Sequence, residues 1–298
     1  MRMLLKTMQG SFFMHQLLIF RLKHTKGIGN IGRLKLLPYL MENPFDYCFE
    51  TMLKIAEIKP KYHAIFVETF NESLKITEED LALYMEEYGM ITFLDKEYPE
   101  QLSHIYNPPV ALFYKGKKEL LQTPMLSIIG SREQTDFGKE MIELLMPDFI
   151  NQKLTIVSGL AKGNDTSAHK LAIRRQGNTI GVLGFGLNRV YPKENQRLQE
   201  YMYQNQLVIT EYLPNESPLP YHFPERNRII AGLSLGTLVV EAKKRSGTFI
   251  TAQLALEEGR SVFAIPNNPL IKESEGCLLH IKDGAKCVQS SSDILEEL

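Results

Sequence analysis

The chain has no tryptophan and few cysteines, and the scarcity of cysteine excludes some classes of protein. Only Cys48, Cys277 and Cys287 occur among its 298 residues, and none of them forms a Cys-x-x-Cys pair. An odd number of widely spaced cysteines argues against a disulfide framework and against a cysteine zinc site. It is typical of a protein kept in a reducing compartment, so we expect a cytoplasmic location.

Strong net charge and long apolar runs are missing too. The formal net charge is −1, so a nucleic-acid site would have to be a local basic patch. The apolar stretch over residues 12–20 is interrupted by His15 and Gln16. It is much shorter than the ~20 apolar residues that a membrane-spanning helix needs. We expect it to form the first helix of a soluble domain, with no membrane as a partner.

The common signatures of nucleotide enzymes are also absent. Gly184-Phe185-Gly186 begins like a dinucleotide fingerprint, but Arg189 stands where the third glycine belongs. No Gly-x-x-x-x-Gly-Lys-Ser/Thr and no His-Glu-x-x-His occurs, and no nucleophile has an assignable base. The sequence therefore offers no catalytic residue, no cofactor site and no metal site.

The first part of the chain, residues 1–85, has a helical pattern and is predicted to be a separate small domain. Two glycines surround Ile28 in the segment 26–33, which favours a tight turn between helices whose amides can face a phosphate. Such turns are structural more often than functional. Thr77 followed by three acidic residues predicts the capped start of another helix.

From Met90 onward the pattern changes to short β-rich runs that alternate with amphipathic stretches. The expected strands are Ile91–Leu94, Val110–Tyr114, Leu126–Ile129, Thr155–Val157, Thr179–Leu183, Leu207–Tyr212, Thr237–Glu241 and Ser261–Ile265, and the expected helices include Phe137–Ile150, Thr166–Arg175 and Phe249–Glu258. Continuous Val/Ile/Leu strands separated by helices indicate a parallel sheet covered on both faces. Residues 86–298 are therefore predicted to form an α/β, extended Rossmann-like, doubly wound and mainly parallel sheet.

Small residues follow most of these strands, often with a hydroxyl or a cation beside them. In doubly wound sheets, ligands bind outside the carboxyl ends of the strands. Four strand ends contribute to one expected phosphate-binding edge: Gly130, Ser131 and Arg132; Ser158, Gly159, Lys162 and Gly163; Gly184 and Gly186; Lys243, Ser246, Gly247 and Thr248. We expect Asp165 and Ser246 to cap helices there. The alternative is that the glycines serve only tight turns.

The segment Phe223–Leu233 combines an aromatic ring with two arginines. On a loop or strand Arg226 and Arg228 would share a face, whereas on a helix they would diverge. A loop that enters a helix at Asn227 would offer both arginines to one anion, and Phe223 could stack on a base. The alternative is that Arg226 pairs with a carboxylate and Phe223 belongs to the core.

An ordered set of motifs in this region resembles the DNA-processing protein A family, also called DprA or Smf. The motifs are Gly130-Ser131-Arg132, Ser158-Gly159-x-Ala161-x-Gly163-x-Asp165, Gly184-x-Gly186-x-x-x-x-Tyr191-Pro192-x-x-Asn195, Phe223-Pro224-x-Arg226-Asn227-Arg228 and Val240-Glu241-Ala242-x-x-x-Ser246-Gly247-Thr248. The resemblance covers roughly residues 90–285. It implies a sterile-alpha-motif-like helical domain followed by an extended Rossmann domain.

The same resemblance implies a role that is not enzymatic. Members bind incoming single-stranded DNA during natural transformation and load the RecA recombinase onto it, displacing or evading single-strand-binding protein. They act as homodimers through the Rossmann domain. We expect the dimer contact in the region beyond about residue 250, where Leu256, Val262, Leu279 and Ile281 lie near the last strands, with RecA docking on or near it. The implied DNA-binding positions are Gly130, Ser131, Arg132, Ser158, Gly159, Lys162, Gly163, Phe223, Arg226, Asn227, Arg228, Lys243, Ser246, Gly247 and Thr248.

Some positions depart from the family pattern. Asn164 stands where an aliphatic residue is usual, Asn267 replaces a glycine, and Leu278 replaces an asparagine. The sequence ends at Leu298, so the winged-helix domain of some relatives, and duplex binding through it, are not expected.

A competing interpretation is a phosphoribohydrolase of the lysine-decarboxylase-like group, for which Glu241 would be the nearby glutamate. A third is a passive partner in a DNA-uptake assembly.

Overall fold

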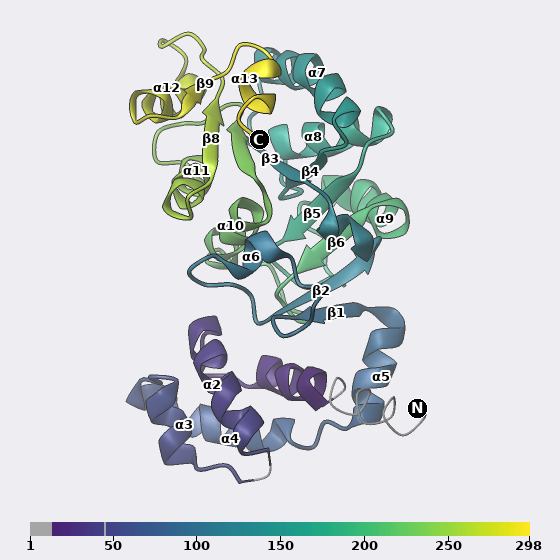
Figure 1. The fold of residues 1–298 in the computed structure, drawn as a ribbon, viewed down its shortest axis with the longest axis vertical. Coiled ribbons are helices and arrows are strands. Elements are labelled where there is room, and N and C mark those ends of the chain that lie inside the picture. The colour runs from purple at the N-terminus through teal and green to yellow at the C-terminus, as the bar shows by residue number, and fades with distance from the viewer. Residues whose placement is uncertain (1–13, 45) are drawn as a thin grey trace. The chain divides into compact units, whose positions relative to one another are not determined.

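The computed structural model describes residues 14–44 and 46–298 (Figure 1). The chain divides into two compact units, residues 1–98 with 107–113 and residues 99–106 with 114–298. Residues 14–24 are helical, in agreement with the helix predicted there, whereas Phe12 and Phe13 lie outside the described residues. The predicted boundary at residue 85, between a helical domain and a Rossmann-like domain, stays a prediction.

The first unit is built mainly of helices. Its elements after residue 24 are α2 (Asn30–Glu42), α3 (Phe49–Ile55), η1 (Pro60–Tyr62), α4 (His63–Ser73), α5 (Glu78–Glu87) and β1 (Gly89–Thr92). The predicted cap of α5 is confirmed, because the Thr77 hydroxyl accepts from the Asp80 amide at 3.1 Å and the Asp80 carboxylate accepts from the Thr77 amide at 2.8 Å. Gly27, at φ +75°, makes the turn before α2. A side chain there would meet Ile65 at 2.9 Å, so this glycine is needed for packing.

The second unit contains a parallel sheet. The strands are β2 (Ala111–Gly116), which continues from the first unit, β3 (Met125–Ile129), β4 (Thr155–Ser158), β5 (Thr179–Leu183), β6 (Leu207–Thr210), β7 (Gly236–Val239), β8 (Ser261–Ala264) and β9 (Lys286–Cys287). Seven of them lie in the order β6-β5-β4-β3-β7-β8-β9, and each neighbouring pair runs parallel. The order reverses at β3, which is the strand pattern of a doubly wound fold.

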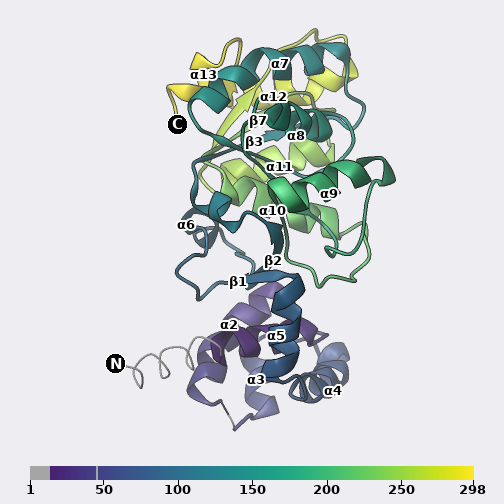
Figure 2. The ribbon, with the colours of Figure 1, turned by 90° about the vertical axis from the view of Figure 1, so that its right-hand side faces the viewer.

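Helices cover both faces of this sheet (Figures 1 and 2). The helices are α6 (Glu100–Ser103), η2 (Lys118–Gln122), α7 (Asp136–Asn151), α8 (Asn164–Arg174), η3 (Lys193–Asn195), α9 (Gln196–Asn205), α10 (His222–Leu233), α11 (Gly247–Glu257), η4 (Lys272–Ser274), α12 (Glu275–Lys282) and α13 (Ser292–Leu295). On β3, Leu126 and Ile128 pack with α7 and α8, whereas the hydroxyl of Ser127 donates to Ile230 of α10 at 2.8 Å. Because successive side chains of a strand point to opposite faces, α8 and α10 cover opposite faces of the sheet.

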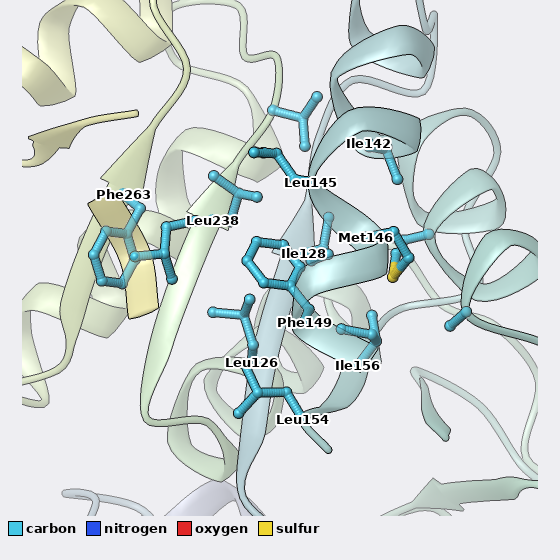
Figure 3. Close-up of a cluster of buried hydrophobic side chains, with 14 of the residues drawn as sticks. Leu126, Ile128, Ile142, Leu145, Met146, Phe149, Leu154, Ile156, Leu238 and Phe263 are labelled. Atoms are coloured by element: carbon cyan, nitrogen blue, oxygen red, sulfur yellow. The ribbon is translucent and has the colours of Figure 1, made fainter. Parts of the chain in front are cut away.

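The core on the α7 side is a cluster of buried aliphatic and aromatic side chains (Figure 3). Phe149 of α7 is fully buried beside Leu126, Ile128 and Leu154. Because β3 is fully covered by helices and neighbouring strands, its sequence is apolar at almost every position, which is why it could be recognised as a parallel strand.

The fold class predicted from the sequence is confirmed, and the element bounds need small corrections. The eight expected strands are present with ends shifted by up to two residues, and β9 was not anticipated. The larger correction concerns α10, which begins at His222 rather than at Asn227. Pro224 lies in the first turn of that helix, where its missing amide costs no intrahelical hydrogen bond.

Candidate nucleic-acid interface

Loops that follow separate strands meet at the carboxyl edge of the sheet. The hydroxyl of Thr248, in the first turn of α11, donates to the Gly130 carbonyl after β3 at 2.9 Å. The Asn164 amide, after β4, donates to the Ser131 carbonyl at 3.2 Å. A Cβ atom on Gly163 would stand 2.4 Å from that carbonyl, so the approach of the two loops requires glycine. The expected convergence of the glycine-rich turns is therefore present.

A pocket of about 100 Å³ opens at this edge. It is lined by Arg132, Gly159, Ala161, Lys162, Tyr191, Pro192, Phe223 and Arg226, and we call it the aromatic pocket. Five of the fifteen positions implied by the family resemblance lie in it, namely Arg132, Gly159, Lys162, Phe223 and Arg226. The pocket draws these residues from the loops after β3 and β4 and from α10.

Two rings and an exposed cation shape the pocket. The Phe223 and Tyr191 rings have centroids 5.5 Å apart and are tilted by 45°. The Arg132 guanidinium lies 5.8 Å from the centre of the Phe223 ring. Tyr191 is 45% exposed and Phe223 is half-buried, so both rings retain accessible surface. Such a site can stack a base and hold the adjoining phosphate.

Arg226 lines the pocket, but its guanidinium is already hydrogen-bonded to backbone carbonyls of the protein. The residue is only 4% exposed, and its Nη1 donates to the Gly159 and Val182 carbonyls, both at 2.6 Å. Burial lowers the pKa of Arg226 to about 10, against the attraction of the Asp165 carboxylate. The side chain holds the carboxyl ends of β4 and β5 together, and a Cβ on Gly159 would collide with it at 2.0 Å.

Arg228 does not line the aromatic pocket. It is 8% exposed and forms a bidentate ion pair with Glu211, with nitrogen-to-oxygen distances of 3.0 and 2.7 Å. Because α10 begins at His222, the two arginines do not flank the start of a helix, which corrects that part of the sequence interpretation. A phosphate contact by Arg228 stays a prediction that this buried ion pair does not favour.

The turn after β7 lies beside the loop after β3. Ser246 caps α11 as expected, accepting from the Phe249 amide at 3.2 Å. Asn227 reaches the Gly247 carbonyl at 3.5 Å, which connects α10 to the start of α11. Lys243 pairs with Glu133 and, at 3.3 Å, with Glu273. These positions do not line the aromatic pocket.

Asp165 has a different role from the predicted cap. Gly163 is the N-cap residue of α8, and Asp165 lies inside the first turn. Its carboxylate accepts from the Gly159 amide at 3.1 Å and from the Ala161 amide at 3.4 Å. Burial raises the pKa of Asp165, and the neighbouring Arg226 and these amides oppose the shift. Asp165 thus fixes the loop that forms one wall of the pocket.

Asn164 and Glu241 form a buried polar hub beneath the loop after β3. The Asn164 side chain is fully buried and donates to the Ser131 carbonyl at 3.1 Å and to the Glu241 carboxylate at 2.9 Å. Glu241, only 1% exposed, also accepts from the Thr135 hydroxyl and from the Thr135 amide. The unusual Asn164 is therefore an anchor of the loop that carries Arg132, and Glu241 is not open to a substrate.

The sequence interpretation did not assign Tyr191 and Pro192 to the site, although it included the loop 158–163 that contains Ala161. Tyr191 and Pro192 were recognised as part of a motif, but no role followed from them. An exposed aromatic in the loop that follows β5 was the available signal, because this loop ends at the same edge of the sheet as the other loops. Phe223 lies beside Tyr191 only in the folded protein, so the pair of rings could not be recognised from the sequence.

Comparisons with known proteins give the family. Residues 89–298 match the family model described as DNA recombination-mediator protein A. DNA processing protein DprA of Streptococcus pneumoniae is 45% identical over 281 residues, which cover 94% of this chain and 96% of that protein. The chain belongs to the DNA recombination-mediator protein A family. The family recognised from the motifs is thereby confirmed, and the phosphoribohydrolase interpretation is not favoured.

Solved structures of this family resemble the chain as well. The X-ray structure of DNA processing protein A from Streptococcus pneumoniae has a TM-score of 0.85 and 43% identity, covering 94% of this chain and 96% of that one. The Helicobacter pylori protein, whose structure concerns its single-stranded-DNA binding mode, has a TM-score of 0.63 and 28% identity, covering 70% of this chain and 94% of that one.

Within residues 14–44 and 46–298, no helix is both long enough and apolar enough to cross a membrane. In the same part of the chain, no group of three or more His, Cys, Asp or Glu side chains could hold a metal ion.

Proposed function

We propose that this recombination-mediator family member binds single-stranded DNA at the aromatic pocket and acts as a carrier of that strand rather than as an enzyme. The observation that carries the proposal is the joining of the Phe223 and Tyr191 rings with the Arg132 guanidinium at one edge of the sheet. The single-stranded-DNA binding of the Helicobacter pylori relative supports it. In this proposal the exposed residues contact DNA, while Arg226 and Asp165 hold the walls.

The chemistry of the pocket favours a single strand over a duplex. A base on the Phe223 ring contributes roughly 1–3 kcal/mol, and any base sequence supplies such a face. In a duplex the bases are already stacked, so the same contact requires unstacking at a cost of a few kcal/mol. Arg132 and Lys162 would neutralise the adjoining phosphates, and the glycines of the two loops allow the backbone to approach.

We further propose that the protein, as a homodimer, loads RecA onto the bound strand and displaces or evades single-strand-binding protein. Support comes from apolar side chains beyond residue 250 that are exposed in the monomer: Leu256 is 41% exposed and Leu270 is 89% exposed. Val262, which we expected at this surface, is instead buried in β8 at 4% exposure. We propose that the surface around Leu256 and Leu270 forms the dimer contact, with RecA docking on or near it. A concentration-independent monomer mass in light scattering would contradict the dimer.

The DNA proposal is tested by comparing oligonucleotides of equal length and sequence. Fluorescence anisotropy at constant salt should give tighter binding to the single strand than to the duplex. Addition of RecA and single-strand-binding protein to the complex should then accelerate RecA filament formation. Equal affinity for both DNA forms would contradict a stacking site, and no acceleration would remove the loading role while leaving DNA binding intact.

A further inference from the structure

Both lysines assigned to DNA binding are already paired with carboxylates. Lys162, at the aromatic pocket, lies 2.5 Å from Glu194, and the two side chains are 55% and 63% exposed. Lys243, on the turn after β7, pairs with Glu133, and these side chains are 40% and 76% exposed. Each glutamate therefore occupies the position at a lysine that a phosphate oxygen would take.

Both glutamates belong to segments that build the site. Glu133 directly follows Arg132, and Glu194 lies in η3, two residues after Pro192 of the aromatic pocket. Hydrogen bonds from Lys243 and Lys162 lower the pKa of Glu133 and Glu194 respectively, so both carboxyls are ionised at neutral pH. Exposed ion pairs contribute little to folding stability, so replacing either glutamate should leave the fold intact.

We propose that Glu133 and Glu194 are affinity-setting residues that compete with DNA phosphates for Lys243 and Lys162. The proposal rests on DNA binding at this edge. A phosphate that displaces one carboxylate replaces one negative partner by another, so the electrostatic gain at each lysine is small. A ligand that also stacks a base on the Phe223 ring gains a further contribution. The glutamates thereby lower the phosphate contribution to DNA affinity and leave the stacking contribution unchanged.

The test removes each negative charge without changing the shape of the side chain. Glu194→Gln and Glu133→Gln should each tighten binding of a single-stranded oligothymidine by about two- to fivefold at constant low salt, the range expected for one exposed charge. Affinity for a matched duplex should rise by at least the same factor, so the preference for the single strand does not increase. Because Glu273 also lies 3.3 Å from Lys243, the Glu194 variant should show the larger effect.

A matched control excludes a general effect of net charge. Glu57 forms a comparable exposed pair with Lys35 at 2.7 Å in the helical unit, with the side chains 74% and 40% exposed. Glu57→Gln changes the net charge by the same amount and should leave DNA affinity unchanged. Equal tightening by Glu57→Gln would overturn the proposal.

A double-variant comparison identifies the lysine as the group that is freed. If Glu194 competes for Lys162, then Glu194→Gln should not tighten binding when Lys162 has been replaced by Ala. A gain that persists in the Lys162→Ala background would overturn the proposal, as would unchanged affinity of both glutamine variants. Because a gain of affinity requires a folded protein, misfolding cannot produce the expected result. Absence of DNA binding by the unaltered protein would instead contradict the proposed function.

Discussion

At the scale of single residues, three arginines that look alike in sequence have different structural roles. Arg132 is exposed beside the Phe223 ring, Arg226 clamps two strand ends through backbone carbonyls, and Arg228 is buried against Glu211. Their motifs could be read from the sequence, but their partners could not. The Val182 carbonyl and the Glu211 carboxylate become neighbours of α10 only when the sheet has formed.

This difference predicts opposite behaviour for two alanine variants. Arg132→Ala should leave thermal stability unchanged and reduce the slope of log affinity for single-stranded DNA against log salt by about 0.7, the effect of one phosphate contact. Arg228→Ala should instead lower the free energy of unfolding by about 3–5 kcal/mol, because it leaves the Glu211 carboxylate buried without its partner. Urea denaturation and salt-dependent binding of both variants check this. A stable Arg228→Ala protein with a reduced salt slope would restore that residue to the DNA site.

At the scale of elements, the sequence was informative wherever burial dictated residue type. The strands were recognisable because both faces of a parallel sheet are covered. The start of α10 was missed because Phe-Pro followed by polar residues is equally compatible with a loop, and only packing against the sheet selects the helix. Helix α8 shows a related limit: it was expected as an amphipathic helix from Thr166, but the burial of its polar Asn164 and His169 could not be predicted from the sequence.

His169 on α8 makes stability depend on pH. Burial and the nearby Arg226 lower its pKa to about 3 from the ordinary value of 6.5. Between these pH values the unfolded chain binds more protons than the folded one, so stability is full above about pH 6.5 and falls as the pH decreases. His169→Asn keeps an amide that can bond to Thr179, which lies 2.7 Å from His169 Nδ1, and removes the titration.

The melting temperature of the unaltered protein should therefore fall more steeply between pH 6.5 and pH 4 than that of His169→Asn. Both proteins retain Asp165, whose raised pKa acts in the opposite direction, so that contribution cancels in the comparison. Parallel melting curves for the two proteins across this range would show that His169 does not titrate as the structure indicates.

At the scale of the whole molecule, a net charge of −1 coexists with a proposed DNA site because the cations act locally. The family could be recognised from its ordered motifs, and the comparison of residues 89–298 confirms it. The pocket itself could not be derived, because its members come from β-strand ends and a helix that are far apart in sequence. Affinity in this account depends on a stacking surface more than on total charge.

The central claim, that a base stacks on the Phe223 ring, is tested most directly by Phe223→Ala. Loss of stacking should weaken binding of single-stranded DNA by about tenfold or more, since 1.4 kcal/mol corresponds to a factor of ten. The salt slope should be unchanged because no charge is removed. Since the ring is half-buried and Tyr191 remains, the melting temperature should change little. Unaltered single-strand affinity in a folded Phe223→Ala protein would contradict the account.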